Sequence, residues 1–179
     1  MKKVCVFCGA HPGDNPIYHE SAKSLGEILS RENIGLVYGG ASIGIMGEVA
    51  NAVLESGGDV TGVITEYLMP IEGHKGLNDL HIVKDMHTRK SMMYQLSDGF
   101  AMLPGGIGTL EEFFEIFTWA QLKFHNKPIG VLNTAGYYTK LIRFLHHIAD
   151  ENFMKREQLE LFFVADTPDK LIKGFQERF

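Results

Sequence analysis

The residues best suited to chemistry lie in one segment, LPGGIGTLEE at positions 103–112. Gly105, Gly106 and Gly108 lack a Cβ, so a ligand can approach the backbone closely there. A helical pattern follows the glycines, and the free N–H groups at a helix N-terminus favour an anion, most often phosphate. Glu112 lies one turn into that helix, where its carboxylate would face the part of the ligand beside the phosphate. The segment therefore predicts a phosphate site with an acid next to it.

Glu112 also has a structural interpretation. Thr109 and Glu112 fit the capping box S/T-x-x-E, in which both side chains bind free N–H groups of the helix. The capping role and a catalytic role for Glu112 both stay open at this point. Capping requires none of the glycines, which favours the phosphate site for them. The spacing matches neither G-x-G-x-x-G nor a Walker A loop, so it indicates neither NAD binding nor ATP hydrolysis.

A basic pair, Arg89-Lys90, lies near the start of another predicted helix. The planar guanidinium of Arg89 suits bidentate contact with phosphate or carboxylate. A solvated pair on the surface is the simpler alternative. Two cations near a helix N-terminus oppose the helix dipole, however, and that small cost hints at another reason for them.

Glycines also follow two earlier strand-like runs. Gly9 follows the run 4–8, and a second glycine-rich loop, 39–47, follows the run 35–38. Two glycine-rich turns in one sheet suggest a ligand bound from two sides, although close packing of helix on strand is an alternative for either loop. Candidate pocket residues in these loops and in the helix that contains Arg89 are Gly9, Gly39, Gly40, Gly44, Met46 and Met93.

The elements that position these residues alternate along the chain. Apolar runs predict strands at 4–8, 35–38, 60–64, 99–103, 129–132 and 161–164, and helical patterns lie at 18–31, 47–56, 87–96, 109–123, 137–150 and 168–176. Strands that are apolar throughout are typical of a parallel sheet with helices on both faces. We expect a Rossmann-like, doubly wound α/β fold, with residues 1–179 as a single domain. Its ligand should lie beyond the carboxyl ends of the strands, near a topological switch point.

The stretch 65–80 reads as one long loop of the lid or binding type, with Glu72 as a lone acid in it. Cys5 and Cys8 lie on the first predicted strand, where residues three apart point to opposite faces, so we expect two packing residues rather than a disulfide. Cys8 lies at the end of this strand, where a ligand could be near. The histidines have no metal-binding spacing, and His146-His147 is most simply a surface pair. We predict no metal and no cofactor.

Composition narrows the class of protein. Apolar residues make up 45% of the 179 residues and charged residues 22%, which are values of a globular chain. The net charge of −5 and the lack of long basic runs argue against nucleic acid as the main partner. No signal peptide or membrane span is evident. We therefore expect a cytoplasmic location and no membrane partner.

Three motifs resemble the LOG (Lonely Guy) family of cytokinin riboside 5′-monophosphate phosphoribohydrolases, whose members have often been mislabelled lysine decarboxylases. They are YGGASIGIMG at 38–47, MHTRK at 86–90 and PGGIGTLEE at 104–112, and the similarity runs from Val4 to about Leu171. The resemblance implies hydrolysis of the N-glycosidic bond of a nucleoside 5′-monophosphate, with Arg89 and Glu112 as the catalytic pair. It implies further substrate contacts from Glu72, Lys90, Gly105, Gly106, Ile107, Gly108, Thr109, Leu110, Glu111 and Thr118.

Two departures from the family pattern bear on substrate preference. Ala41 replaces a glycine of the Y-G-G-G loop, and Ala10-His11 replace paired serines. A non-catalytic carrier of a nucleotide or of molybdenum cofactor is the alternative function, because related Rossmann-like domains have that role. Lysine decarboxylation has little support, since pyridoxal phosphate needs a Schiff-base lysine and its surrounding site. The resemblance also implies a homodimer, for which the aromatic helix 113–119 could supply the contact or could instead be core.

Overall fold

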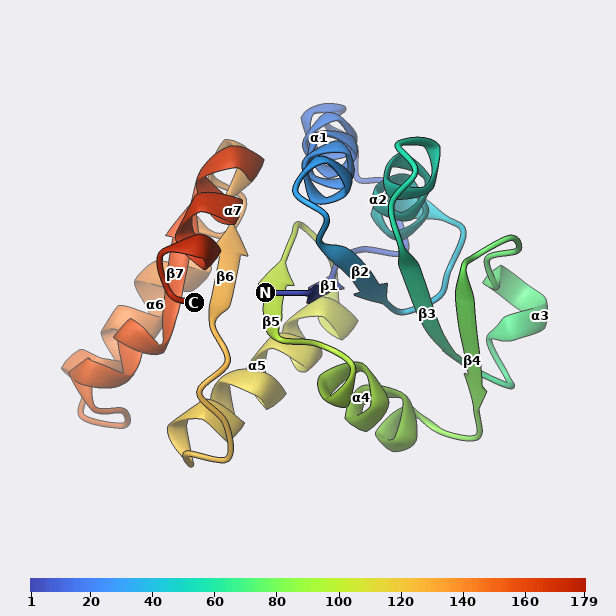
Figure 1. Ribbon diagram of the computed structural model, residues 1–179. Helices are drawn as coiled ribbons and strands as arrows, with labels where there is room; N and C mark the ends of the chain where they lie inside the picture. The colour runs from blue at the N-terminus through green and yellow to red at the C-terminus, as the bar shows by residue number, and fades with distance from the viewer.

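One parallel sheet of seven strands forms the centre of the protein (Figure 1). The computed structural model describes all residues, 1–179. The strands lie side by side in the order β4-β3-β2-β1-β5-β6-β7. Their bounds are β1 Lys3–Phe7, β2 Gly35–Tyr38, β3 Val60–Thr65, β4 Asp79–Val83, β5 Gly99–Met102, β6 Ile129–Leu132 and β7 Phe162–Ala165. The order reverses at β1, so the predicted doubly wound α/β fold is confirmed.

Helices cover both faces of this sheet (Figure 1). They are α1 Ile17–Arg31, α2 Gly44–Glu55, α3 Met69–Glu72, α4 Met86–Gln95, α5 Ile107–Gln121, α6 Thr139–Asp150 and α7 Pro168–Gln176, with 3₁₀ turns η1 at Thr134–Gly136 and η2 at Arg156–Leu161. One face packs on α1, α2 and α7, and the other on α4, α5 and α6, each through its own buried apolar cluster. None of the helices has both the length and the apolar character that a membrane crossing requires.

The two cysteines lie on opposite faces of the sheet, as the strand period predicts. Cys5 belongs to the cluster under α4, α5 and α6, whereas Cys8 belongs to the cluster under α1, α2 and α7. Both thiols are buried and free. The C-x-x-C sequence is therefore a packing feature of β1 and of the residue that follows it.

The aromatic helix serves the core. Phe113 and Phe117 of α5 are buried, and Phe114 and Trp119 pack partly exposed against the same cluster. Phe113 and Phe117 stack with their ring centroids 5.7 Å apart, and both meet Phe162 edge to face. Of the two roles considered for this stripe, the structure has the core role.

The predicted loop over 65–80 is wrong at 69–72 and at its last two residues. It contains the short helix α3, and β4 begins at Asp79 and pairs in parallel with β3. β4 is an edge strand whose residues are mostly half-buried or exposed. A strand of this kind lacks the continuous apolar run by which the buried strands are recognised.

Candidate active site

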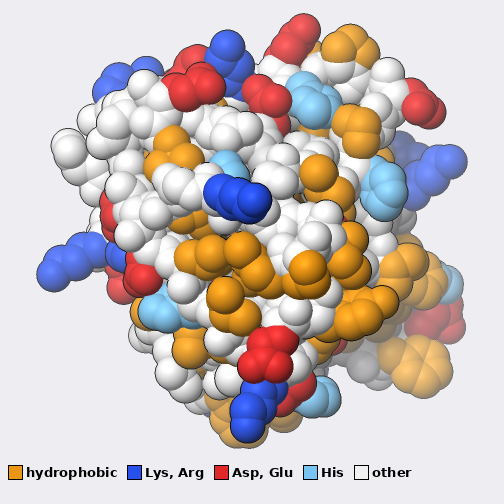
Figure 2. Space-filling model, turned by 90° about the vertical axis from the view of Figure 1, so that its right-hand side faces the viewer, with side chains coloured by type: hydrophobic (Ala, Val, Ile, Leu, Met, Phe, Trp, Pro, Cys, Tyr) orange, Lys and Arg blue, Asp and Glu red, His pale blue; other side chains and the backbone are white.

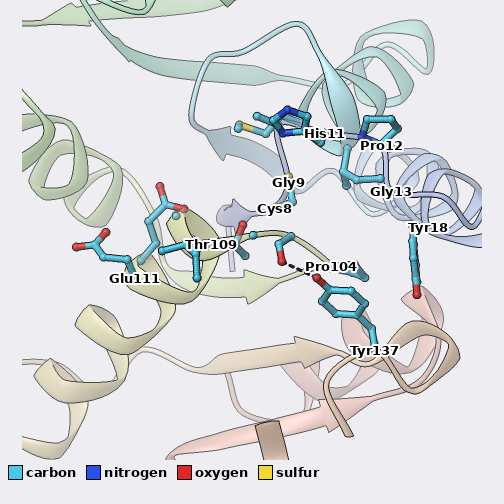
Figure 3. A pocket seen from close by; sticks show the side chains of 18 of the residues that line it. Cys8, Gly9, His11, Pro12, Gly13, Tyr18, Pro104, Thr109, Glu111 and Tyr137 are labelled. Atoms are coloured by element: carbon cyan, nitrogen blue, oxygen red, sulfur yellow. Dashed lines mark hydrogen bonds between the residues drawn. The ribbon is translucent and has the colours of Figure 1, made fainter. Parts of the chain in front are cut away.

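A cavity of about 410 Å³ opens at the carboxyl ends of β1 and β5, where the strand order reverses (Figure 3). This is the position at which doubly wound sheets bind ligands. The loop after β1 forms one wall and the turn between β5 and α5 forms another. Residues from the starts of α1, α2 and α4 and from the turn before α6 complete the lining, among them Tyr18, Met46, Met86, Arg89 and Tyr137.

The turn between β5 and α5 presents unpaired amides to this cavity. None of the N–H groups from Gly105 to Thr109 donates a hydrogen bond within the protein. A Cβ built on Gly106 or on Gly108 would meet no atom within 4 Å, and both residues line the cavity. Packing therefore does not require these two glycines, and the space above them is open to a ligand. Free amides at a helix N-terminus fit an anion such as phosphate.

Gly105 and Gly9 have a different role. A Cβ on Gly105 would collide with the side chain of Thr109, and one on Gly9 would lie 3.3 Å from the Cα of Gly105. The amide of Gly9 donates to the carbonyl of Pro104 at 3.1 Å. These two glycines let the loop after β1 and the turn after β5 approach each other closely.

The capping box, one of the two interpretations left open for Glu112, is not formed. Helix α5 begins at Ile107, its N-cap is Gly106, and no side chain caps it. The glycines continue into the first turn of the helix, so Thr109 is already its third residue. Glu112 therefore lies too far along the helix to bind the free amides, and its capping interpretation no longer applies.

Arg89 is a buried cation held by backbone carbonyls. Its side chain is 6% exposed, and it donates from Nε to the carbonyl of Val63 at 2.9 Å and from Nη2 to that of Gly39 at 3.1 Å. A Cβ on Gly39 would collide with Nη2, so this glycine makes room for the guanidinium. Arg89 forms no salt bridge with a protein carboxylate, and the guanidinium lines the cavity. The surface-pair alternative for Arg89 is therefore wrong.

Glu112 lines the same cavity from α5. Burial raises the pKa of its carboxyl from the usual 4.5 to about 7, and the positive charge of Arg89 limits the rise. Glu111 and Glu115 on the same helix add to it by repulsion. Glu112 thus changes its charge near neutral pH, in a cavity that it shares with the cation of Arg89. Perturbed acids of this kind in a cavity are typical of active sites.

Lys90 lies outside the cavity, where it links α4 to α5. Its ammonium group is bonded to the carboxylate of Glu111 and, at 3.0 Å, to that of Glu115. The Lys90 side chain is 10% exposed. The single charge of Lys90 offsets part of the negative charge of Glu111 and Glu115, and these two bonds tie α4, which carries Arg89, to α5.

The second glycine-rich loop is explained mainly by packing. Gly44 has a φ of 60°, and a Cβ there would collide with the carbonyl carbon of Ala10. A Cβ on Gly47 would collide with the carbonyl group of Ser42. The amide of Met46 donates to the carbonyl of Gly9 at 3.1 Å. Of the two interpretations of this loop, close packing accounts for Gly44, which lies against the loop after β1, and for Gly47, which lies against Ser42 of the same loop.

The structure places the predicted site residues in two groups. Those that line the cavity are Gly9, Met46, Arg89, Gly105, Gly106, Ile107, Gly108, Thr109, Glu111 and Glu112. Those that lie outside it are Gly39, Gly40, Gly44, Glu72, Lys90, Met93, Leu110 and Thr118. Thr118 is exposed on α5, about 16 Å along the helix axis from Ile107. Contacts of this second group with a ligand stay predictions.

Several cavity residues are absent from the predicted set. Tyr18 and Tyr137 line the wall opposite Glu111 (Figure 3), and Met86 lies beside Arg89, whose Nη1 approaches its sulfur at 3.7 Å. Tyr18 and Tyr137 were assigned only to the helical patterns 18–31 and 137–150. Each lies close to the start of a helix after a strand, and this position was the available signal.

Fold and site together define a class: a protein with a Rossmann-like nucleotide-binding fold whose switch-point cavity is lined by free backbone amides, Arg89 and Glu112. A family model described as "Possible lysine decarboxylase" matches residues 46–175. A cytokinin riboside 5′-monophosphate phosphoribohydrolase of Rhodococcoides fascians is 50% identical over 86% of this chain and 78% of its own length. One of Arabidopsis thaliana is 44% identical over 99% of this chain and 83% of its own length.

The chain therefore belongs to the LOG family, whose model carries the decarboxylase description. Solved structures agree on the fold. The molybdenum cofactor carrier protein of Chlamydomonas reinhardtii superposes with a TM-score of 0.75 at 20% identity, covering 98% of this chain and 96% of that one. A molybdenum cofactor binding protein of Rippkaea orientalis has a TM-score of 0.74 at 17% identity, with coverage of 99% and 97%. At these identities the likeness concerns the fold alone.

Proposed function

We propose that this protein hydrolyses the N-glycosidic bond of cytokinin riboside 5′-monophosphate or AMP to give the free base and ribose 5-phosphate. The observation that carries the proposal is the placement of Glu112 and Arg89 in one cavity with the free amides of 105–109. The relatives named for this activity, which match nearly the whole chain, support it.

In this mechanism the amides of the glycine turn bind the 5′-phosphate and so fix the sugar beside Glu112. Breaking the bond from the anomeric carbon to the base builds positive charge on the sugar ring. The ionised carboxylate of Glu112 stabilises this charge and orients the attacking water. Water gives its hydroxyl to the anomeric carbon and its proton to the departing base. Arg89 clamps the nucleotide, and its positive charge favours the ionised form of Glu112.

Lysine decarboxylation, which the family description names, fits the cavity poorly. Pyridoxal phosphate chemistry requires a lysine for the Schiff base. No lysine is among the residues that line the cavity, and the nearby Lys90 is engaged by two glutamates. The carrier alternative has only the fold in its favour.

The direct test is product analysis. Wild-type protein incubated with AMP or with isopentenyladenosine monophosphate should release the free base and ribose 5-phosphate, separated by HPLC. A comparison of the two substrates also measures the base preference that Ala41 and His11 bear on. Folded protein that binds these nucleotides without forming product would instead favour the carrier function.

We further propose a homodimer. Large exposed hydrophobic side chains gather on α3, β4 and the segments beside them, among them Tyr67, Ile71, Ile82 and Met86. Figure 2 shows hydrophobic side chains across the middle of this side of the molecule. Contiguous exposed apolar surface of this kind is typical of a protein–protein interface. Met86 also lines the cavity, so a second copy packed here would lie next to the site.

A further inference from the structure

Two adjacent tyrosines hold the turn that carries the free amides. The hydroxyl of Tyr138 donates to the carbonyl of Leu103 at 2.7 Å, and the hydroxyl of Tyr137 donates to the carbonyl of Gly105 at 2.7 Å. Figure 3 shows the bond from Tyr137. Neither tyrosine belongs to the turn itself, since both come after β6 and η1 in the chain. The anion site therefore depends on a distant part of the chain.

The bond from Tyr137 fixes the peptide between Gly105 and Gly106. In a planar trans peptide the C=O and N–H groups point in opposite directions. A hydroxyl that holds the Gly105 carbonyl on one side therefore directs the Gly106 amide to the other. A peptide between two glycines has no Cβ to restrain it and is the easiest in the turn to rotate. Rotation would point a carbonyl oxygen toward the ligand where an amide is needed.

The local structure places both hydroxyls in advance. Ala135 and Gly136 adopt left-handed conformations with φ of 51° and 75°, which reverses the chain before the tyrosines. The amide of Tyr138 donates to Oδ1 of Asn133 at 2.7 Å. Tyr138 is 3% exposed. The Tyr137 ring packs edge to face on Tyr138, with a centroid distance of 4.7 Å, and on Tyr18 at 5.4 Å.

We propose that Tyr137 is a positioning residue for phosphate recognition, with Tyr138 fixing the end of β5 behind it. Tyr137 acts through the Gly105–Gly106 peptide, which it holds with the amide facing the cavity. The proposal rests on the proposed function only for the identity of the ligand, a nucleoside 5′-monophosphate. Its chemistry requires a phosphate or a similar anion at the amides.

The test is Tyr137→Phe, which removes one hydroxyl and keeps the ring. We expect the KM for AMP to rise about three- to tenfold, the range for a lost neutral hydrogen bond. The kcat should stay within about twofold, because the reacting groups stay in place. Calorimetric affinity for AMP and for orthophosphate should fall by the same factor, and affinity for adenosine should not. Tyr94→Phe is the matched control, since Tyr94 packs on Trp119 away from the cavity.

The other outcomes decide separately on the inference and on the proposed function. An unchanged KM for AMP in Tyr137→Phe, with or without a lower melting temperature, assigns the hydroxyl a purely structural role. An equal loss for adenosine places its action away from the phosphate. If the wild-type protein shows no turnover but Tyr137→Phe still binds orthophosphate more weakly than wild type, the proposed function is refuted and the inference is supported. Wild-type protein that binds neither AMP nor orthophosphate refutes both.

Discussion

Glu112 is the residue on which the proposed chemistry depends most. Glu112→Gln keeps the size of the side chain and removes its charge. We expect kcat to fall by about 10²- to 10⁴-fold, the range for losing a positioned acid–base group. Affinity for AMP, measured calorimetrically, should change little, because the amides that bind the phosphate are unaffected. Glu27→Gln, at an exposed glutamate of α1, is the control and should retain full activity.

If Glu112→Gln kept the wild-type rate, Glu112 would have no part in the mechanism.

The stability of Glu112→Gln relative to wild type provides a second test of the Glu112 carboxyl. Because the folded-state pKa is raised from 4.5 to about 7, the native protein favours the protonated acid and loses this stabilisation as the pH rises through 7. The difference corresponds to on the order of 3 kcal/mol at pH 8, as an upper bound. Glu112→Gln avoids this cost, so it should melt no lower than wild type at pH 8.

The same carboxyl predicts the pH dependence of the reaction. Only the ionised form of Glu112 can stabilise a cationic sugar, and burial raises its pKa to about 7. The kcat/KM for AMP should therefore rise with pH and level off above about 7, as stopped-time HPLC assays across pH 5 to 9 would reveal. The weak residual activity of Glu112→Gln should lack this step, which separates it from ionisation of the substrate phosphate. A kcat/KM that falls through pH 7 would mean that the protonated acid is the active form.

At the scale of elements, Gly39, which follows β2, leaves the space that the guanidinium of Arg89 occupies. A Cβ on Gly39 would collide with Nη2 of Arg89 and force the guanidinium out of its place. Gly39→Ala should reduce kcat/KM about 10- to 100-fold, as expected for a displaced catalytic group. Gly35→Ala on the same strand is the matched control, because its Cβ meets only the flexible side chains of Lys3 and Asp59, at 3.1 and 3.3 Å. Equal activity of both variants would show that Arg89 needs no such space.

The start of α5 should show a conflict between stability and binding. Gly108 lies in the first turn of the helix, and a Cβ there meets no protein atom. Gly108→Ala should raise the free energy of unfolding by about 0.5–1 kcal/mol, because alanine favours the helix. The added methyl would intrude on an anion bound at the amides, so the KM for AMP should rise at least about fivefold. Thermal melts and initial rates measure both effects, and a stabilised variant with unchanged KM would place the phosphate elsewhere.

How well the sequence predicted these elements depended on burial. The strands at 35–38 and 129–132 were predicted to the residue because all their side chains are buried and apolar. β4 was missed because an edge strand needs no such run. The N-terminus of α5 was placed two residues late, because glycine at the N-cap gives no side-chain signal and Gly108 is a poor helix former.

The candidate site was predicted in part, because only some of its groups lie within one segment of the sequence. Free amides and a following acid are adjacent in sequence, so the segment 103–112 revealed them. The carbonyls that hold Arg89 belong to Val63 of β3 and to Gly39, which follows β2, and Tyr137 reaches Gly105 from the segment after β6. Such contacts between distant segments have no local sequence pattern, and they require the three-dimensional structure.

At the scale of the whole molecule, the proposed homodimer predicts the mass in solution and the face through which two copies associate. Sedimentation equilibrium should give twice the 20.0 kDa of the chain. Ile82→Lys puts a charge on the exposed edge strand, where Ile82 is 52% exposed, and should shift the mass toward the monomer with little loss of stability. Val164→Lys on the opposite edge strand, at 44% exposure, is the control and should keep the dimer. A wild-type monomer at micromolar concentration would contradict the proposal.

The position of β1 in the middle of the sheet has a consequence for biosynthesis. Of the seven strands, β1 is made first, but its neighbour β5 is made only after residue 98, and the two pair in parallel. During translation the N-terminal half can form the four strands β1, β2, β3 and β4 as one sheet, while the edge of β1 that later pairs with β5 remains uncovered. Exposed strand edges of this kind invite pairing with other chains. Ribosome-bound nascent chains that end before β5 should therefore recruit chaperones, and release them once α5 has emerged.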